Sequence, residues 1–167
     1  MMKLYVTYCS AEKRQGIHRP DQLYLSNRIN HFIKKCKTAN LDWAIFSALH
    51  GFFFPDQEKN AYNVTLRTNK EYWLGIAVVE DEEKLPQDQS KEQIAHLGAT
   101  LQQQAKNRDI DHLIFYGPSP KMMKCYLAVL HYAFDRCAKP HGWQDLLQHV
   151  KNTSRMIGVV HKMDLIS

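Results

Sequence analysis

The fold class is decided by the sequence KLYVTYCS at residues 3–10. Apolar and polar side chains alternate from Lys3 to Tyr8, which is the period of a half-buried β-strand, and the stretch ends in the small residues Cys9 and Ser10. Apolar runs at 41–48 (LDWAIFSA) and 111–117 (DHLIFYG) are typical of buried strands, and 156–161 (MIGVVH) predicts a short last strand.

Helical periodicity fills the intervals between these strands. Apolar side chains recur every three or four residues over 23–37, 90–107 and 120–139, and a short helix is predicted over 143–151. Ser90-x-x-Gln93 is a capping box, and Ser119-Pro120 places an N-cap residue before a proline. Alternation of strands and helices predicts an α/β fold: a single three-layer domain over residues 1–167, with a mostly parallel central sheet of about four to five strands.

Residues 64–79 allow two interpretations. Val64 to Arg67 and Tyr72 to Val79 have strand composition and predict an inserted hairpin, whereas Thr68-x-x-Glu71 is a capping box that would start a helix. The β-branched residues and Gly75 favour the hairpin. The polar stretch 9–22 and the stretch 49–63 are predicted to be loops.

Charge is distributed unevenly over the 167 residues. The net charge of +5 divides into +6 for residues 1–40, −5 for residues 41–117 and +4 for residues 118–167. A basic head of this kind argues against a general DNA coat and leaves open a localised basic face that meets phosphate.

Several classes of protein are excluded or disfavoured. No apolar run approaches 18 residues, so a transmembrane helix is not expected, and the strand-like start predicts a cytoplasmic protein with free thiols. The four cysteines contain no Cys-x-x-Cys pair and the nine histidines are scattered singly, so we expect no metal and no cofactor. Walker and GxGxxG loops are absent, which disfavours ATP hydrolysis and dinucleotide binding.

The candidate site follows from the rule that ligands of α/β sheets bind beyond the carboxyl ends of the strands. Three predicted strands end in short polar or glycine-containing sequences. The candidate residues they supply are Cys9, Ser10, Lys13 and Arg14 after the first strand, Ser47, His50 and Gly51 after the second, and Gly117 and Ser119 after the third.

These residue types suggest particular roles. Cys9 near Lys13 and Arg14 would have its thiolate favoured, as a nucleophile requires, and His50 could serve as acid or base in a dyad with it. Gly117 and Ser119 at a helix start suit a phosphate or carboxylate. Each position also has a structural interpretation, as a tight turn or a solvated side chain. The aromatic run Phe52–Phe54 and Tyr62 could stack on a nucleobase, although packing on the core is favoured.

The same residues carry a family resemblance. The motifs are Cys9-Ser10-x-x-Lys13, Leu23-Tyr24-Leu25-Ser26 and Phe46-Ser47-Ala48-x-x-Gly51-Phe52, with Pro55 and Tyr62 nearby. The sequence resembles a family of small prokaryotic and phage α/β domains of unknown function. It is more distantly similar to a domain of archaeosine synthase, an enzyme of 7-deazaguanine transfer RNA modification, and to the uracil-DNA glycosylase-like fold. The resemblance adds Tyr24 and Tyr62 to the candidate ligand contacts.

Three functions are therefore kept. The first is a domain that binds or modifies a nucleotide, a modified nucleobase, RNA or DNA at the carboxyl ends of the strands. The second is a non-catalytic nucleic-acid-binding module that uses the basic head. The third is a thiol-dependent hydrolase or transferase acting on a small metabolite through Cys9.

Overall fold

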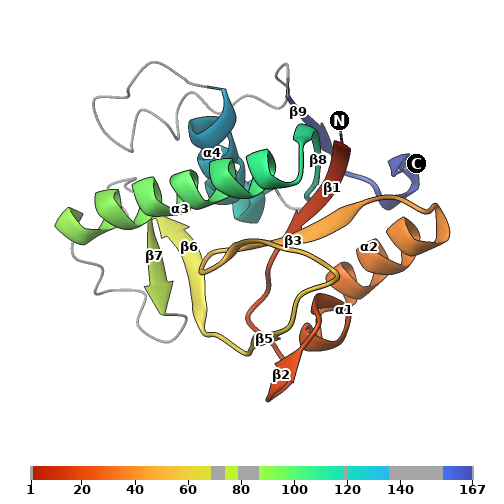
Figure 1. Cartoon of the computed structure of the whole chain (residues 1–167). Helices are drawn as coiled ribbons and strands as arrows, with labels where there is room; N and C mark the ends of the chain where they lie inside the picture. Colours follow the sequence, from red (N-terminus) through yellow and green to blue (C-terminus); the bar gives the residue numbers. More distant parts are fainter. Residues whose placement is uncertain (1, 69–73, 79–86, 119, 136–155, 167) are drawn as a thin grey trace.

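The core of the fold is a five-stranded sheet in the order β4-β3-β1-β8-β9. The computed structural model describes residues 2–68, 74–78, 87–118, 120–135 and 156–166 (Figure 1). Strands β1 (Met2–Tyr8), β3 (Trp43–Ser47), β8 (Ile110–Tyr116) and β9 (Ile157–Val160) are mutually parallel, and only β4 (Gly51–Phe53) is antiparallel. The predicted α/β class and mostly parallel sheet are confirmed.

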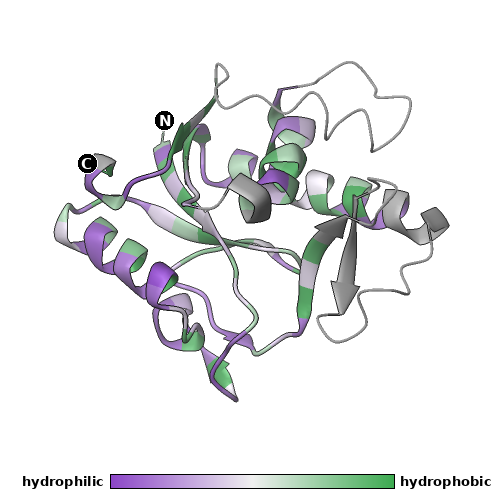
Figure 2. Ribbon diagram, turned by 180° about the vertical axis from the view of Figure 1, so that it is seen from behind, coloured by the Kyte–Doolittle hydropathy of each residue, from purple (hydrophilic) through white to green (hydrophobic). Residues whose placement is uncertain are grey.

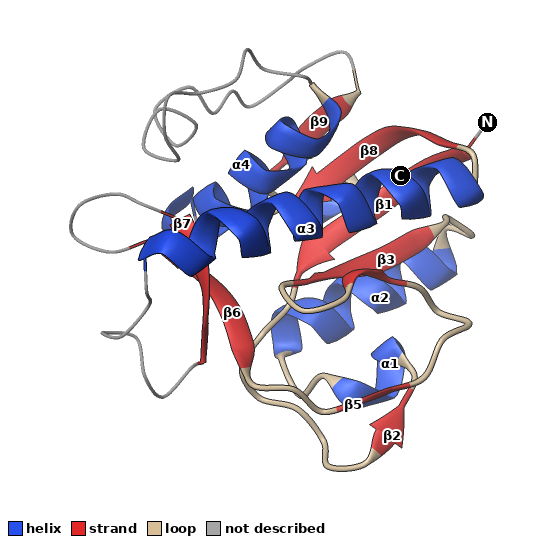
Figure 3. Ribbon diagram, turned by 60° about the vertical axis from the view of Figure 1, so that its left-hand side comes forward, coloured by secondary structure: helices blue, strands red, loops and turns tan. Residues whose placement is uncertain are grey.

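Helices cover both faces of this sheet, as the side chains of β1 show. Thr7 points to the face covered by α2 (Asn27–Thr38), where it contacts Arg28. Tyr8 points to the opposite face, where its ring stacks on Tyr126 of α4 (Pro120–Phe134) at 5.4 Å between centroids. Helix α3 (Gln87–Asn107) lies beside α4 on that second face, as Figure 3 shows.

The packing of α2 explains where that helix begins. Its buried side chains are Ile29, Phe32, Ile33 and Cys36, a spacing that gives one apolar stripe. The Ser26 hydroxyl accepts a hydrogen bond from the Ile29 N–H, so Ser26 is the N-cap. The prediction that this helix starts at Leu23 is therefore wrong by four residues, and Leu25 lies before the helix with 46% of its surface exposed.

The hairpin predicted over 64–79 is confirmed in its two strands. Strand β6 (Val64–Thr68) pairs antiparallel with β7 (Leu74–Val78), and the pair forms its own two-stranded sheet beside α3. The residues between the strands lie outside the described part of the chain. The hairpin thus closes one end of the α3 and α4 layer (Figure 1).

The two stretches predicted to be loops contain short regular elements. Strand β2 (Ile17–His18) and helix α1 (Pro20–Leu23) lie within 9–23, and β4 and β5 (Lys59–Asn60) lie within 49–63. β2 pairs with β5, so the loops that follow β1 and β4 are joined to each other. These pairings are too short to have a sequence period, which is why composition indicated only loops.

Other boundaries differ slightly from the sequence prediction. Helix α3 begins at Gln87, three residues before the predicted Ser90 cap, and α4 is described as far as Phe134. The predicted helix over 143–151 lies outside the described residues. After β9 the chain ends in a short 3-10 helix, η1 (Met163–Leu165).

Candidate functional site at the carboxyl edge of the sheet

The site lies where the chain changes direction around β1. The chain passes from β1 through α2 to β3 on one side and returns through α3 to β8 on the other side. In open α/β sheets such a switch point leaves a place for ligands beyond the strand ends. Here the two central strands are linked at their ends, because the Thr7 hydroxyl donates to the Tyr116 carbonyl oxygen at 2.8 Å.

Cys9 is the first residue after β1, and it is almost fully buried. Its N–H donates to the Phe46 carbonyl oxygen at 2.9 Å, which extends the pairing of β1 with β3, and only 6% of its surface is exposed. The thiol Sγ lies 3.3 Å from the phenol oxygen of Tyr126. That oxygen is also 2.9 Å from the Thr65 hydroxyl and accepts from the Leu66 N–H at 3.4 Å. Tyr126 therefore joins the sheet edge to the β6–β7 hairpin.

Arg28, in the first turn of α2, reaches over the end of β1. Its guanidinium donates to the Thr7 hydroxyl at 2.6 Å and to the Tyr8 carbonyl oxygen at 2.8 Å, with a longer contact of 3.5 Å to the Cys9 carbonyl oxygen. The guanidinium carbon also lies 3.7 Å from the centre of the Tyr8 ring. These contacts fix a cation at the switch point, beside Cys9.

Lys13 supplies a second cation from the loop after β1. Its ammonium donates to the Ser10 carbonyl oxygen at 2.6 Å, with a longer contact of 3.4 Å to the Ala11 carbonyl oxygen. The same group lies 4.1 Å from the centre of the Tyr62 ring. An isolated bridge between Lys13 and Tyr24 holds the loop in this position.

Aromatic side chains line the lysine side of the site. The hydroxyls of Tyr24 and Tyr62 are hydrogen-bonded to each other, and the Tyr62 ring meets the His50 ring edge-on at 5.3 Å between centroids. Tyr24 is only 2% exposed. The Ser47 hydroxyl accepts from the N–H groups of Leu49 and His50, at 3.2 and 3.0 Å, so it also shapes the turn that presents His50.

The electrostatics of the site are positive. Burial lowers the pKa of Lys13 and of Arg28, and a thiolate at Cys9 would act in the opposite direction on both. Burial also raises the pKa of Tyr24, Tyr62 and Tyr126, so all three phenols are neutral at pH 7. Within the described ranges neither Lys13 nor Arg28 forms an ion pair with a carboxylate. The carboxyl edge thus carries two partly buried cations that have no carboxylate partner in the described part of the chain.

Ser10 adds a polar group to this edge. Its hydroxyl oxygen exposes less than 1 Å² and has no hydrogen-bond partner in the described part of the chain. A buried hydroxyl without a partner is unusual in a folded protein, because its desolvation is then uncompensated. Ser10 directly follows Cys9 and shares its loop with Lys13.

Seven of the residues predicted from the sequence have side chains at the carboxyl edge of the sheet. The seven are Cys9, Ser10, Lys13, Tyr24, Ser47, His50 and Tyr62. The thiol of Cys9 has Tyr126 as its hydrogen-bond partner, so a dyad of Cys9 with His50 stays a prediction. Arg14 is exposed and braces its own loop by donating to the Gln22 carbonyl oxygen at 3.2 Å.

Both candidate glycines have structural roles at this edge. Gly51 has φ +74, and a Cβ there would lie 2.5 Å from the side-chain oxygen of Gln104, which accepts from the Phe52 N–H. A Cβ at Gly117 would lie 2.8 Å from the sulfur of Met123, so this glycine lets α4 approach β8. Ser119 lies outside the described residues, and an anion site at the start of α4 stays a prediction.

The aromatic run is part of the core. Phe52, Phe53 and Phe54 are 0%, 0% and 2% exposed, so stacking of these rings on a nucleobase is excluded in this arrangement. Tyr62 is half-buried.

Sequence reasoning missed two residues of the site. Arg28 lies within the basic head of residues 1–40, and Tyr126 is one of the apolar positions of the helix predicted over 120–139. One signal was available for Tyr126: a buried tyrosine generally needs a partner for its hydroxyl, so a tyrosine inside an apolar stripe marks a polar contact. Arg28 gave no such signal, because its partners, the Thr7 hydroxyl and the carbonyl oxygens of Tyr8 and Cys9, lie about twenty residues away in sequence.

Within the described ranges there is no group of three or more His, Cys, Asp and Glu side chains that could hold a metal ion. No helix in the described part of the chain is both long and apolar enough to cross a membrane.

The fold and the site belong to a family that is defined by sequence. The model of a family of unknown function (DUF6884) matches residues 4–140, and the chain belongs to that family. The matched region contains the whole cluster around Cys9, from β1 to α4. Comparison with curated proteins and with solved structures gave no match.

Proposed function

We propose that this chain binds a nucleotide at the carboxyl edge of its sheet. The observation that carries the proposal is the pair of partly buried cations, Lys13 and Arg28, which has no carboxylate partner among the described residues. Burying a charge is unfavourable unless a partner compensates it, and a phosphate group would be such a partner.

The aromatic side of the site supports a ligand that carries a base as well as a phosphate. Tyr62 and His50 are half-buried. The Tyr62 ring lies 4.1 Å from the ammonium of Lys13, and the His50 ring lies against the Tyr62 ring. Planar side chains of this kind suit the face of a nucleobase. The resemblance of the Cys9, Tyr24 and Ser47 motifs to a domain of archaeosine synthase and to the uracil-DNA glycosylase-like fold agrees with this class of ligand.

The proposal is tested by titration with nucleoside monophosphates, the matching nucleosides and inorganic phosphate, followed by NMR chemical shifts or calorimetry. We expect a monophosphate to bind more tightly than its nucleoside. Lys13→Met should weaken this binding on the order of tenfold, because a charge-assisted hydrogen bond is lost. Arg14→Gln is the matched control, since it removes one neighbouring charge that faces solvent. No binding at millimolar concentration, or equal loss in both variants, would contradict the proposal.

A second candidate is thiol chemistry at Cys9, favoured by the Tyr126 hydroxyl beside its sulfur and by the electrostatic interaction of Cys9 with Lys13 and Arg28. In such a step the thiol proton passes to water and sulfur bonds to an electrophilic carbon of the ligand. The leaving group then departs with the electron pair of the broken bond. Cys36 provides an internal control, because burial raises the pKa of its thiol to about 12. Iodoacetamide should label Cys9 faster than Cys36, and equal rates would remove this candidate.

A further inference from the structure

Helix α2 carries an unusual distribution of charge. Its sequence, NRINHFIKKCKT, contains four Lys or Arg residues and no acidic residue. Only Lys37 has an ion-pair partner within the described ranges, Asp21 at 2.7 Å, and Figure 2 shows the hydrophilic outer side of the helix. Lys34 and Lys37 are three residues apart, so their like charges repel slightly, whereas the helix dipole favours the two lysines of the last turn, Lys35 and Lys37.

Three of the basic residues and one histidine form a continuous flank of the helix. Arg28, His31 and Lys35 are spaced by three and four residues and therefore lie on one side of the helix, with Lys34 beside them. Lys37, which pairs with Asp21, is one turn from Lys34 and lies on the far side of the helix from Arg28 and Lys35. His31 and Lys34 are exposed and Lys35 is half-buried, so the flank is open to solvent.

This flank begins inside the candidate site. Arg28 holds the end of β1 and lies beside Cys9. His31, Lys34 and Lys35 follow it along α2. The position of Arg28 opposes the helix dipole, because a cation in the first turn is disfavoured. The dipole accounts for Lys35 in the last turn and leaves Arg28 unexplained.

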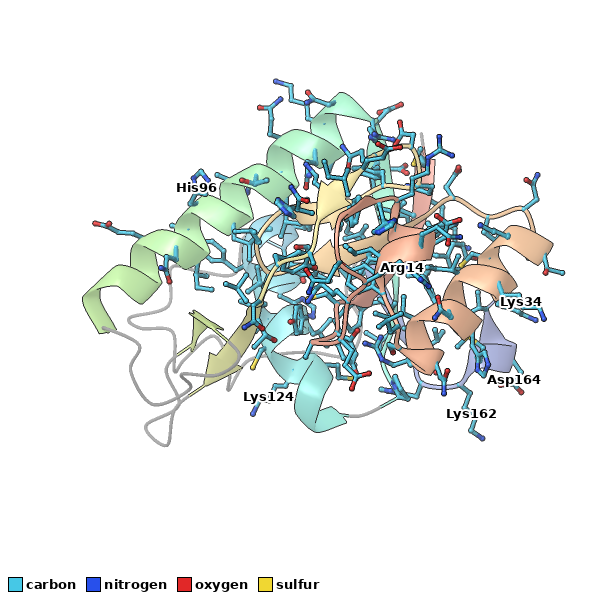
Figure 4. All side chains as sticks on the ribbon, turned by 90° about the horizontal axis from the view of Figure 1, so that it is seen from below. Arg14, Lys34, His96, Lys124, Lys162 and Asp164 are labelled. Atoms are coloured by element: carbon cyan, nitrogen blue, oxygen red, sulfur yellow. The ribbon has the colours of Figure 1, made fainter. Side chains whose placement is uncertain are left out.

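One further lysine and one aspartate lie on the same side of the molecule as the flank. Figure 4, which views the molecule from below, shows Lys34 and Lys162 on the same side, with Asp164 as the one labelled acid between them. Lys162 and Asp164 are both exposed. His96 on α3 lies well away from this side in the same view.

We infer that the ligand of the site is one nucleotide of a nucleic acid strand, whose neighbouring phosphates lie along the flank formed by Arg28, His31, Lys34 and Lys35. This inference rests on the proposed function and names its substrate class. The seven helical steps from Arg28 to Lys35 span about 10 Å along the helix axis. A stacked strand carries about three phosphates over that length, at roughly 3.4 Å each.

The test compares a mononucleotide with single-stranded RNA and DNA oligonucleotides of mixed sequence, by fluorescence anisotropy at several salt concentrations. We expect the oligonucleotide to bind more tightly than the mononucleotide. The double variant Lys34→Gln, Lys35→Gln should lose affinity for the oligonucleotide on the order of tenfold or more at low salt. It should also reduce the slope of log affinity against log salt by about 1.4, which is 0.7 for each phosphate contact. Its affinity for the mononucleotide should not change.

The matched control is the double variant Lys3→Gln, Lys106→Gln. Both residues are exposed and lie at the amino edge of the sheet, near the starts of β1 and β8, and the variant has the same change in net charge. Equal losses in the two double variants, or an oligonucleotide that binds no more tightly than the mononucleotide, would overturn the inference. A different outcome would overturn the proposed function: wild type does not bind the mononucleotide, but it binds the oligonucleotide through Lys34 and Lys35. The flank would then be a binding surface without the nucleotide site.

Discussion

The two cations of the site are held in different ways. Arg28 belongs to a helix and bonds to the end of a core strand, where its guanidinium contacts Thr7, Tyr8 and the Cys9 carbonyl oxygen. Lys13 belongs to a loop, and its partners among the described residues are carbonyl oxygens of that same loop, beside the Tyr62 ring. The part of the site around Arg28, here called the inner half, is therefore held by the core strand itself. The part around Lys13, the outer half, is held by a loop. Substitutions should therefore separate stability from binding.

The largest expected effect is at Arg28. Arg28→Met should lower the free energy of unfolding by about 2–4 kcal/mol, because it removes charge-assisted hydrogen bonds to Thr7 and Tyr8 at the end of a central strand. Urea denaturation measures this change. Arg14→Met is the control and should stay within about 0.5 kcal/mol of wild type, since Arg14 is exposed. A stable Arg28→Met protein would show that the inner half is not part of the fold.

The next effect concerns the link to the hairpin. Tyr126→Phe should destabilise the protein by about 1–3 kcal/mol, because the Thr65 hydroxyl and the Leu66 N–H lose their shared partner. Protection of the Leu66 amide from hydrogen exchange should fall as well. Tyr116→Phe is a suitable control, since its ring stacks on Phe32 at 6.0 Å and its hydroxyl forms no hydrogen bond within the described ranges. Equal losses in the two variants would mean that the hydroxyl of Tyr126 does not hold the hairpin.

Lys13 should behave in the opposite way to Arg28. Burial lowers the pKa of both residues, but the hydrogen bonds of Lys13 in the described part of the chain stay within its own loop, whereas those of Arg28 hold the end of a core strand. Lys13→Met should therefore leave the free energy of unfolding within about 0.5 kcal/mol of wild type, or raise it, and still weaken ligand binding. Thermal unfolding without ligand measures the first effect. A strongly destabilised variant would place Lys13 among the structural residues.

The smallest effect is the pH dependence contributed by His50. Burial, and then the charge of Lys59, lower the pKa of His50 below 6.5. On acidification the unfolded chain binds this proton first, so stability is present above pH 6.5 and is lost as the pH falls through the folded pKa. His50→Gln should reduce the loss of stability between pH 6.5 and 5, measured by urea denaturation. Above about pH 7.5 His50 is neutral in the folded and the unfolded chain, so the difference in stability between the two proteins should there be constant.

Sequence reasoning found the elements with strong periodicity and missed what depends on distant contacts. The strands at Lys3 to Tyr8 and 111–117 were evident, because burial on a sheet leaves a period or a continuous apolar run. The edge strand β4 could not be predicted, because its pairing with β3 depends on Gly51 and on a hydrogen bond from Phe52 to Gln104, which lies 52 residues further along the chain. At the site, Cys9 and Lys13 were indicated by their place after a strand. Arg28 and Tyr126 came from tertiary packing, which one sequence does not display.

The central claim is that Lys13 and Arg28, at the carboxyl edge of the sheet, hold a phosphate. The most direct measurement is a calorimetric or NMR titration of wild type, Lys13→Met and Arg14→Gln with one nucleoside monophosphate and its nucleoside at low salt. The account predicts that wild type and Arg14→Gln bind the monophosphate more tightly than the nucleoside, and that Lys13→Met loses this preference. Equal binding of monophosphate and nucleoside by wild type, or the same preference in Lys13→Met, would contradict it.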